Sequence, residues 1–142
     1  MQYNRSIPSP GVIPVLSYPD VNEAAVWLCA AFGFTVRLRV GNSHRVQLNV
    51  QESGAVIVRE RHADEIGATL GVGCSVMIRV EDADAHCKRA KEHGAWVTQE
   101  PTTHIFGERQ YSCKDLAGYS WTFSQSVADV SPEEWGGIVE HL

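Results

Sequence analysis

The feature that most constrains the fold of this 142-residue chain is a repeated order of elements in its two halves. In each half, the residue pattern predicts one strand, then a capped helix, then three further strands. Gly33 and Gly94 follow the two helices at an offset of 61 residues, and Gly54 and Gly118 mark later turns at an offset of 64. Matched glycines of this kind are typical of a duplicated unit. Neither half closes a core easily alone, so each is expected to pack against the other or against a second chain.

The first helix is predicted over residues 21–32. Asp20 is a suitable N-cap, and Glu23 three residues later completes a capping box. Apolar residues then recur on one face, and Gly33 follows where a left-handed C-terminal cap is expected. The same signals predict a second helix over residues 82–94.

Alternating or β-branched segments predict the strands. These segments are 12–18, 34–40, 45–50, 55–59, 74–80, 95–98, 108–114 and 119–125. A loop is expected over 99–107 and a short helix over 131–136, while Ser and Pro in the first ten residues predict a loose N-terminus. The order predicts an α+β fold of two βαβββ modules, at about 11–60 and 73–126, within one domain of residues 1–142.

Composition and charge exclude several classes of function. Hydrophobic residues make up 44% of the chain and charged residues 20%, which is typical of a globular protein. The net charge is -5 and Lys and Arg are dispersed, so nucleic acid is not an expected partner. No apolar run is long enough to span a bilayer and no signal peptide is recognised, which predicts a cytoplasmic protein without a membrane partner. The four cysteines lack CxxC spacing and are expected to be buried thiols.

Several short motifs occur in a fixed order over residues 12–125. They are Tyr18-Pro19-Asp20, Trp27-Leu28, Ala31-Phe32-Gly33-Phe34, Gly107-Glu108-Arg109, Asp115-Leu116-Ala117-Gly118 and Trp121-Thr122-Phe123. As an ordered set they resemble the vicinal oxygen chelate superfamily, which includes glyoxalase I, fosfomycin-resistance proteins, extradiol dioxygenases and bleomycin-resistance proteins. The resemblance is greatest to a glyoxalase-like branch in which an AFGF helix end and a GER strand start recur. It implies curved mixed sheets around a cavity, helices outside, and a homodimer.

In the catalytic members of this family, four side chains on the first and last strands of each module hold a divalent metal. The matching positions here are Ile13, Val58, Ser75 and Thr122. Ile and Val have no donor atom, and neutral hydroxyls are poor ligands without carboxylate or imidazole neighbours. The departure from the family pattern therefore predicts neither a metal site nor another cofactor.

The same family positions indicate which strand residues face the cavity, because successive strand residues point to opposite sides. Thr122 is then expected to point inward, with Trp121 and Phe123 toward the helices. Leu28 and Phe32, on the first helix, are expected to be buried against these aromatic rings.

The strand over residues 45–50 independently shows a polar and an apolar side. The offset of 64 residues carries its polar side to Arg109, Tyr111 and Cys113 in the second module. The predicted pocket residues are Arg45, Gln47, Asn49, Ser75, Met77, Arg79, Arg109, Tyr111 and Thr122, with Ile13, Val15, Val56 and Val58 as an apolar wall.

A partly apolar pocket with a few convergent polar groups suits a small organic ligand, anionic or aromatic in character. Two or three arginines favour a carboxylate or a similar anion, and the alternative is that these arginines lie solvated at strand ends. His104, with Phe106, is expected to form a lip over the cavity next to Glu108. The spacing of His104 and Glu108 in a loop does not imply shared metal coordination. His86 and His93, on the second helix, are expected on the outer surface.

The leading hypothesis is a small-molecule-binding protein similar to the bleomycin-resistance branch, which sequesters its ligand without chemistry. The alternative is a lyase, isomerase or dioxygenase of the same fold. Such an enzyme would use a relocated metal, or Tyr111, Arg109 and Glu108 as acid, anion clamp and base. A third hypothesis is a structural partner subunit with a vestigial cavity. Elemental analysis of the purified protein discriminates between the first hypothesis and a metalloenzyme.

Overall fold

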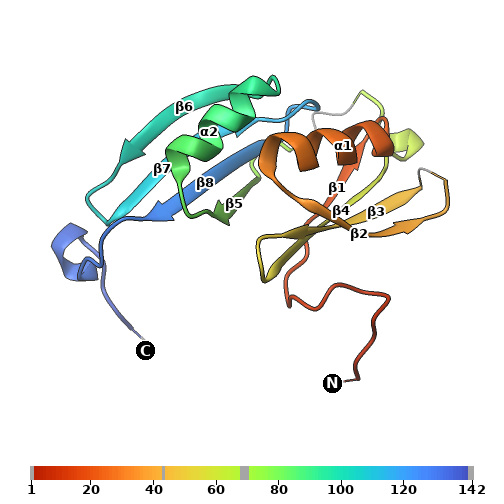
Figure 1. The fold of residues 1–142 in the computed structure, drawn as a ribbon. Coiled ribbons are helices and arrows are strands. Elements are labelled where there is room, and N and C mark those ends of the chain that lie inside the picture. Colours follow the sequence, from red (N-terminus) through yellow and green to blue (C-terminus); the bar gives the residue numbers. More distant parts are fainter. Residues whose placement is uncertain (1, 43, 68–70, 141–142) are drawn as a thin grey trace.

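The computed structural model describes residues 2–42, 44–67 and 71–140 and contains two four-stranded mixed sheets. The strand order is β1-β4-β3-β2 in the first sheet and β5-β8-β7-β6 in the second. One helix packs on each sheet, and the two helices lie next to each other on the same side of the molecule (Figure 1). The predicted α+β fold of two βαβββ modules is confirmed.

The elements follow the predicted order in both modules. The first module contains β1 (Val15–Tyr18), α1 (Val21–Phe32), β2 (Thr35–Val40), β3 (Arg45–Val50) and β4 (Gly54–Glu60), followed by the 3-10 helix η1 (Ala63–Glu65). The second contains β5 (Ser75–Arg79), α2 (Ala83–Glu92), β6 (Trp96–Thr103), β7 (Glu108–Lys114) and β8 (Ser120–Ser126), followed by the 3-10 helix η2 (Pro132–Trp135).

The capping residues set the bounds of α1 as the sequence predicts. The Asp20 side chain accepts a hydrogen bond from the Glu23 backbone N–H at 3.0 Å. At the other end, Gly33 has a φ of 79° and donates its N–H to the Cys29 carbonyl. This left-handed conformation is one that glycine adopts at little cost.

Strand β6 differs most from the prediction, because it continues to Thr103 through most of the expected loop. It is an edge strand that pairs only with β7, and its pairing is irregular between Val97 and Gln99 and between Gln99 and Thr102. An irregular edge strand tolerates Pro101, since the missing N–H is not needed for a second neighbour.

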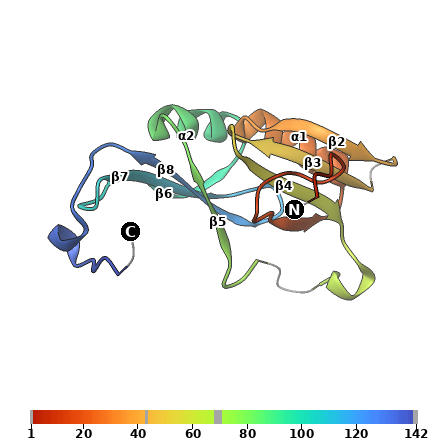
Figure 2. The same ribbon diagram turned by 90° about the horizontal axis from the view of Figure 1, so that it is seen from below.

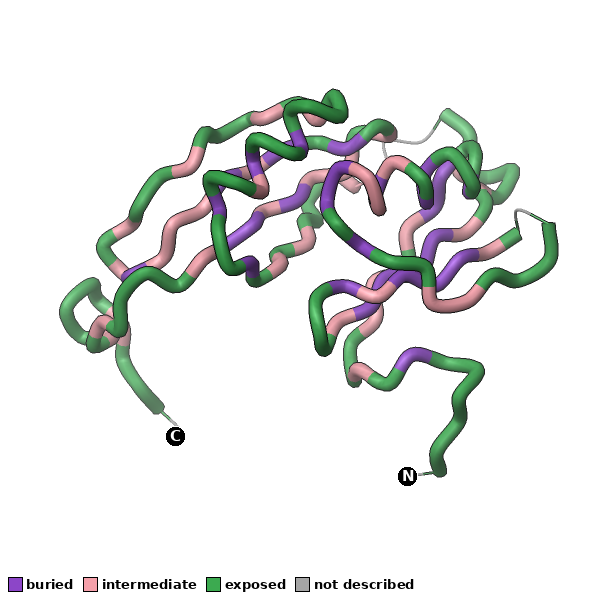
Figure 3. The backbone as a smooth tube through the Cα atoms, viewed as in Figure 1, coloured by how far each residue is buried: buried purple, intermediate pink, exposed green. Residues whose placement is uncertain are grey.

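The core lies between the helices and the sheets and runs through both modules. Figure 3 shows the buried segments on the helices and on the strand residues that face them. Leu28, Phe32, Trp121 and Phe123 are at most 1% exposed, so the packing prediction is confirmed. The Phe32 ring lies 4.8 Å from the Phe123 ring, which joins α1 of the first module to β8 of the second.

A buried carboxylate forms a second link between the modules. Asp115, at the β7–β8 turn, accepts the Tyr18 hydroxyl at 2.6 Å and the Trp121 indole N–H at 3.0 Å. Its other oxygen accepts the backbone N–H groups of Ala117 and Tyr119. Burial and the adjacent Asp115 carboxylate raise the pKa of Tyr18, so its hydroxyl stays a donor. Asp115 thus orders its own turn and connects it to the end of β1.

The prediction that His86 lies on the outer surface is wrong, because α2 packs against α1 and covers this side chain. Its Nδ1 lies 2.5 Å from the Tyr111 hydroxyl and its Nε2 lies 3.0 Å from the Phe32 carbonyl at the end of α1. Burial lowers the pKa of His86, which favours the neutral ring. The neutral ring donates to Phe32 through Nε2 and accepts the Tyr111 hydroxyl proton. His93 is exposed as expected.

All four cysteines are free thiols. Cys87 and Cys113 are buried as predicted, and Cys29 is half-buried. Cys74 is exposed, because it lies in the turn before β5 instead of within the strand. Among the described residues, no helix has both the length and the apolar character needed to cross a membrane.

Candidate ligand-binding site

Each sheet has one face that its helix does not cover, which we call the open face. In the second sheet, Met77 of β5 pairs with Thr122 of β8, and Thr122 pairs with Ser112 of β7. The Ser112 and Thr122 hydroxyl oxygens lie 2.8 Å apart on this face. Because alternate residues share a face, eleven side chains of these three strands belong to it. They are Ser75, Met77, Arg79, Glu108, Gln110, Ser112, Lys114, Ser120, Thr122, Ser124 and Ser126.

A hydrogen-bonded chain of side chains crosses one end of this open face. Gln110 donates to the Ser124 hydroxyl at 3.0 Å, and Ser124 donates to Glu108 at 2.7 Å. Arg79 donates to the Ser126 hydroxyl. Hydrogen bonds from Ser126 and Ser124 lower the pKa of Glu108, so its carboxylate is ionised at neutral pH. The face therefore offers an anion and a cation that share serine neighbours, with neutral hydrogen-bonding groups beside them.

The prediction that Arg109, Tyr111 and Cys113 face the cavity is wrong. Arg109 forms a two-pronged ion pair with Asp84 of α2, with both N–H groups 2.9 Å from carboxylate oxygens. Tyr111 is 0% exposed and contacts His86, and Cys113 is 1% exposed. These side chains lie on the helix-covered side of β7. Glu108 lies on the opposite side, so the three groups considered for acid-base chemistry do not meet.

The error arises from an offset that is one residue too short. Val15 lies five residues before Asp20, the N-cap of α1, and it pairs with Ile57. Met77 lies five residues before Asp82, the N-cap of α2, and it pairs with Thr122. The matching offset is therefore 65 residues, and a one-residue slip moves a whole strand to the other face. The two glycines that were matched at an offset of 64 are not structurally equivalent. Gly118 has a positive φ of 92°, whereas Gly54 does not have a positive φ and is the first residue of β4.

The same slip affects the expected apolar wall. Val56 and Val58 are buried against α1 at 1% and 0% exposure, on the helix-covered side. Ile57 takes the open-face position, together with Val15 of β1. Thr122, Ser75, Met77 and Arg79 are on the open face of the second sheet as predicted. Glu108 is on the same face, and the role of all five residues in binding stays a prediction.

On the first sheet, Arg45, Gln47 and Asn49 share the open face, opposite the buried Val46, Leu48 and Val50. Gln47 is nevertheless only 3% exposed, because residues 5–8 cover it. This segment forms no helix or strand, as its Ser and Pro residues predict, and Pro8 within it is buried. Asn49 donates to the Thr35 hydroxyl of β2 at 3.2 Å.

The loop between β6 and β7 carries an aromatic cluster at the end of the second sheet. The His104 and Phe106 rings are stacked with centroids 5.0 Å apart, and Phe106 lies 5.3 Å from Trp135 of η2. Trp135 of the short C-terminal 3-10 helix therefore packs on this loop. The cluster is next to Glu108 in the chain, while a role as a lip over bound ligand stays a prediction.

A cleft of about 520 Å³ lies where the two modules meet, beside the open face of β5. The β3–β4 turn lines one side, and β5 residues including Met77 and Arg79 line the other. Another hollow, of about 540 Å³, lies between Asp20 and Ile66 near the start of α1. We favour the first as a ligand site because it is continuous with the polar open face.

The residues present do not fit the divalent metal that the catalytic relatives hold. The open-face residue of β4 at the metal-ligand position is Ile57 and not Val58, and neither side chain has an atom that could bind a metal. Ser75 and Thr122 provide only neutral hydroxyls. Across the described ranges, no three His, Cys, Asp or Glu side chains gather closely enough to hold a metal ion.

Comparison with known proteins identifies the family. The family model described as Glyoxalase/Bleomycin resistance protein/Dioxygenase superfamily matches residues 13–123. The chain belongs to this superfamily. No curated protein matched the chain in the sequence comparison.

Several solved structures share the fold of the chain. TioX from Micromonospora sp. ML1 is 30% identical with a TM-score of 0.67, over 83% of this chain and 99% of TioX. TnmS3 from Streptomyces sp. CB03234, described as an antibiotic binding protein, is 19% identical with a TM-score of 0.66, over 85% and 98% of the two chains. A superfamily enzyme from Burkholderia phytofirmans PsJN is 12% identical with a TM-score of 0.71, over 83% and 99%.

Proposed function

We propose that this protein binds a small organic molecule at the open face of its second sheet and sequesters it without metal-dependent chemistry. The observation that carries the proposal is the concentration of polar side chains on that face beside a cleft. Seven hydroxyl or amide side chains lie there with Arg79, Lys114 and Glu108, and Met77 adds an apolar surface that is 62% exposed. In small-molecule sites, placed polar groups of this kind fix the orientation of the ligand.

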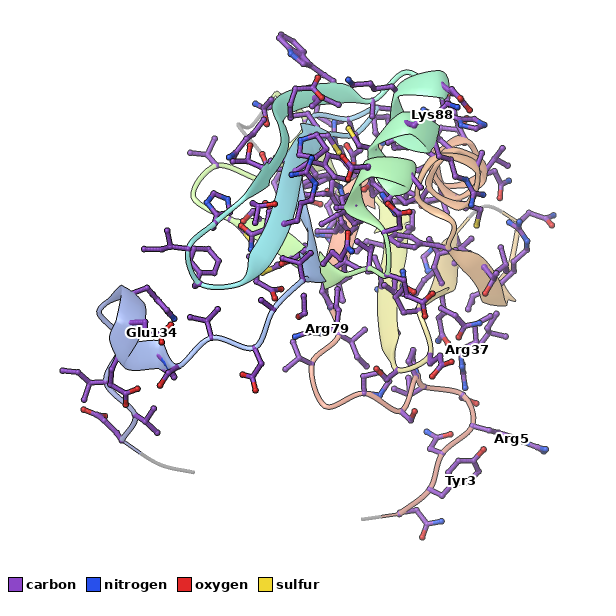
Figure 4. All side chains as sticks on the ribbon, turned by 60° about the vertical axis from the view of Figure 1, so that its left-hand side comes forward. Tyr3, Arg5, Arg37, Arg79, Lys88 and Glu134 are labelled. Carbon is purple, nitrogen blue, oxygen red and sulfur yellow. The ribbon has the colours of Figure 1, made fainter. Side chains whose placement is uncertain are left out.

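The exposed Arg79 supports an anionic ligand, and aromatic acids belong to the class that we propose. Arg79 is exposed on the open face, and a guanidinium binds carboxylates with two parallel hydrogen bonds. Figure 4 shows Arg79 on the underside of the second module. The cleft volume of about 520 Å³ is within the range of sites for drug-sized molecules. TnmS3, which has the same fold and is described as an antibiotic binding protein, supports a small-molecule ligand.

We also propose that the protein is a cytoplasmic homodimer. The sheets of one chain lie side by side and leave both open faces uncovered by helices, as Figure 2 shows from below. A second copy would cover the exposed Met77 and turn the open face into an enclosed cavity. Sedimentation equilibrium should give twice the chain mass of 15.7 kDa, and a monomer at micromolar concentration would contradict this part. The four free thiols are consistent with a reducing compartment.

The binding proposal is tested with two neighbouring residues of β7 that point to opposite faces. Small aromatic and aliphatic acids are screened by thermal shift, since a ligand that binds only the folded state raises the melting temperature. The best compound is then titrated by calorimetry into the native protein, Gln110→Ala and Arg109→Ala. Gln110→Ala should weaken binding roughly twofold to tenfold, as expected for loss of one neutral hydrogen bond.

Arg109→Ala is the matched control, because its side chain pairs with Asp84 on the helix side. It should leave the affinity unchanged. The proposal fails if Arg109→Ala weakens binding and Gln110→Ala does not, or if no compound of these classes binds.

A further inference from the structure

A segment of the chain itself covers part of the open face of the first sheet. Residues 4–8, which we call the N-terminal strap, cross the open face of the first sheet (Figure 2). Arg37 of β2 donates to the Arg5 carbonyl at 2.8 Å, and Gln47 of β3 donates to the Ser6 carbonyl at 2.9 Å. Figure 4 shows Arg37 directed toward the segment that carries Arg5.

The strap has an internal turn and is held by two coupled side chains. The Asn4 side chain accepts the Ser6 backbone N–H at 3.0 Å, and the Asn4 carbonyl accepts the Ile7 N–H at 3.3 Å. Arg37 also donates to the Gln47 side-chain oxygen at 2.5 Å, which orients the amide toward Ser6. A guanidinium and an amide N–H thus hold two carbonyl oxygens, the same chemistry that would bind a ligand carbonyl or carboxylate.

We infer that the strap masks a second acceptor-binding region of the site, formed by Arg37 and Gln47, and that a ligand reaching the first sheet must displace it. This inference rests on the proposed function, because it assigns a ligand to the open faces. The strap restricts small ligands to the second sheet. Arg37 and Gln47 then select larger ligands that carry a carbonyl or carboxylate able to replace the strap.

Docking of the strap is tested by trypsin, which cuts after arginine and therefore reports exposure of the Arg5–Ser6 bond. In the native protein the bond is protected, since cleavage follows the population in which the segment is released. Arg37→Ala should raise the rate of cleavage roughly fivefold to tenfold. Arg39→Ala is the control: Arg39 is on the same strand but donates to Asn22 of α1. Equal cleavage of the native protein and Arg37→Ala would overturn the inference.

Masking is tested with the dye 1-anilinonaphthalene-8-sulfonate, an aromatic anion, titrated into the full chain and a variant lacking residues 2–9. The variant should bind the dye threefold to tenfold more tightly, which is the gain expected from one additional hydrogen bond to the dye. Equal or weaker binding by the variant would overturn masking. If the dye binds neither protein, the proposed function loses its support for aromatic anions, and the trypsin rates alone decide whether the strap is docked.

Discussion

Asp115 provides a quantitative test of how the two modules are held together. It is 7% exposed and accepts hydrogen bonds from Tyr18 and Trp121, both of which are 0% exposed. Asp115→Ala leaves the Tyr18 hydroxyl and the Trp121 indole N–H without an acceptor. Each buried donor left unpaired costs about 1–3 kcal/mol, so the free energy of unfolding should fall by about 2–6 kcal/mol. Such a loss is a large part of the stability of an ordinary domain.

The measurement is urea denaturation at one fixed protein concentration, followed by tryptophan fluorescence and circular dichroism. Asp129→Ala serves as the control, because Asp129 is exposed and a surface change of this kind costs within about 0.5 kcal/mol. In a Tyr18→Phe background, Asp115→Ala should lower the free energy of unfolding by about 1–3 kcal/mol less, because the Tyr18 hydroxyl is already absent. A cost below about 1 kcal/mol for Asp115→Ala, or a coupling near zero, would refute the reasoning.

Three further predictions concern the core, the metal and pH. Leu28→Ala should cost about 2–5 kcal/mol in chemical denaturation, because Leu28 is 0% exposed, and a loss near zero would contradict its place in the core. Slight excesses of zinc, nickel, manganese or iron should not raise the melting temperature, and a chelator-reversible rise would contradict the misfit of the metal positions. The lowered pKa of His86 means that the unfolded chain binds the proton more readily, so stability should fall as pH drops through the ordinary value of 6.5. His86→Gln should reduce this dependence between about pH 7.5 and 5.5, and an unchanged slope would show that His86 is not its source.

The order of elements could be predicted because its signals are local. Asp20 and Gly33 fix the ends of α1 by capping, and the alternation in 45–50 fixes which side of β3 is buried. The face of β7 was predicted wrongly because it was copied from β3 through a false glycine match. The alternation within β7 itself predicts the observed face, because Tyr111 and Cys113 are less polar than Gln110 and Ser112 and face the core.

Other features depend on contacts between distant segments, which one sequence does not reveal. His86 is half-buried because α2 packs against the end of α1, 54 residues away in the chain. Gln47 is covered by a strap whose serine and proline residues predict irregular structure but not where it docks. The docking of Trp135 on Phe106 likewise follows from the path of the chain after β8.

The most direct test of the central claim uses the methyl group of Met77 as a reporter on the open face of the second sheet. The chain contains two methionines, so ¹³C-methyl labelling gives a spectrum that Met77→Leu assigns at once. Titration with the compound selected by thermal shift should move the Met77 signal in a saturable way, with the dissociation constant found by calorimetry. A Met77 signal that stays unchanged while calorimetry shows saturated binding would place the ligand elsewhere and contradict the account.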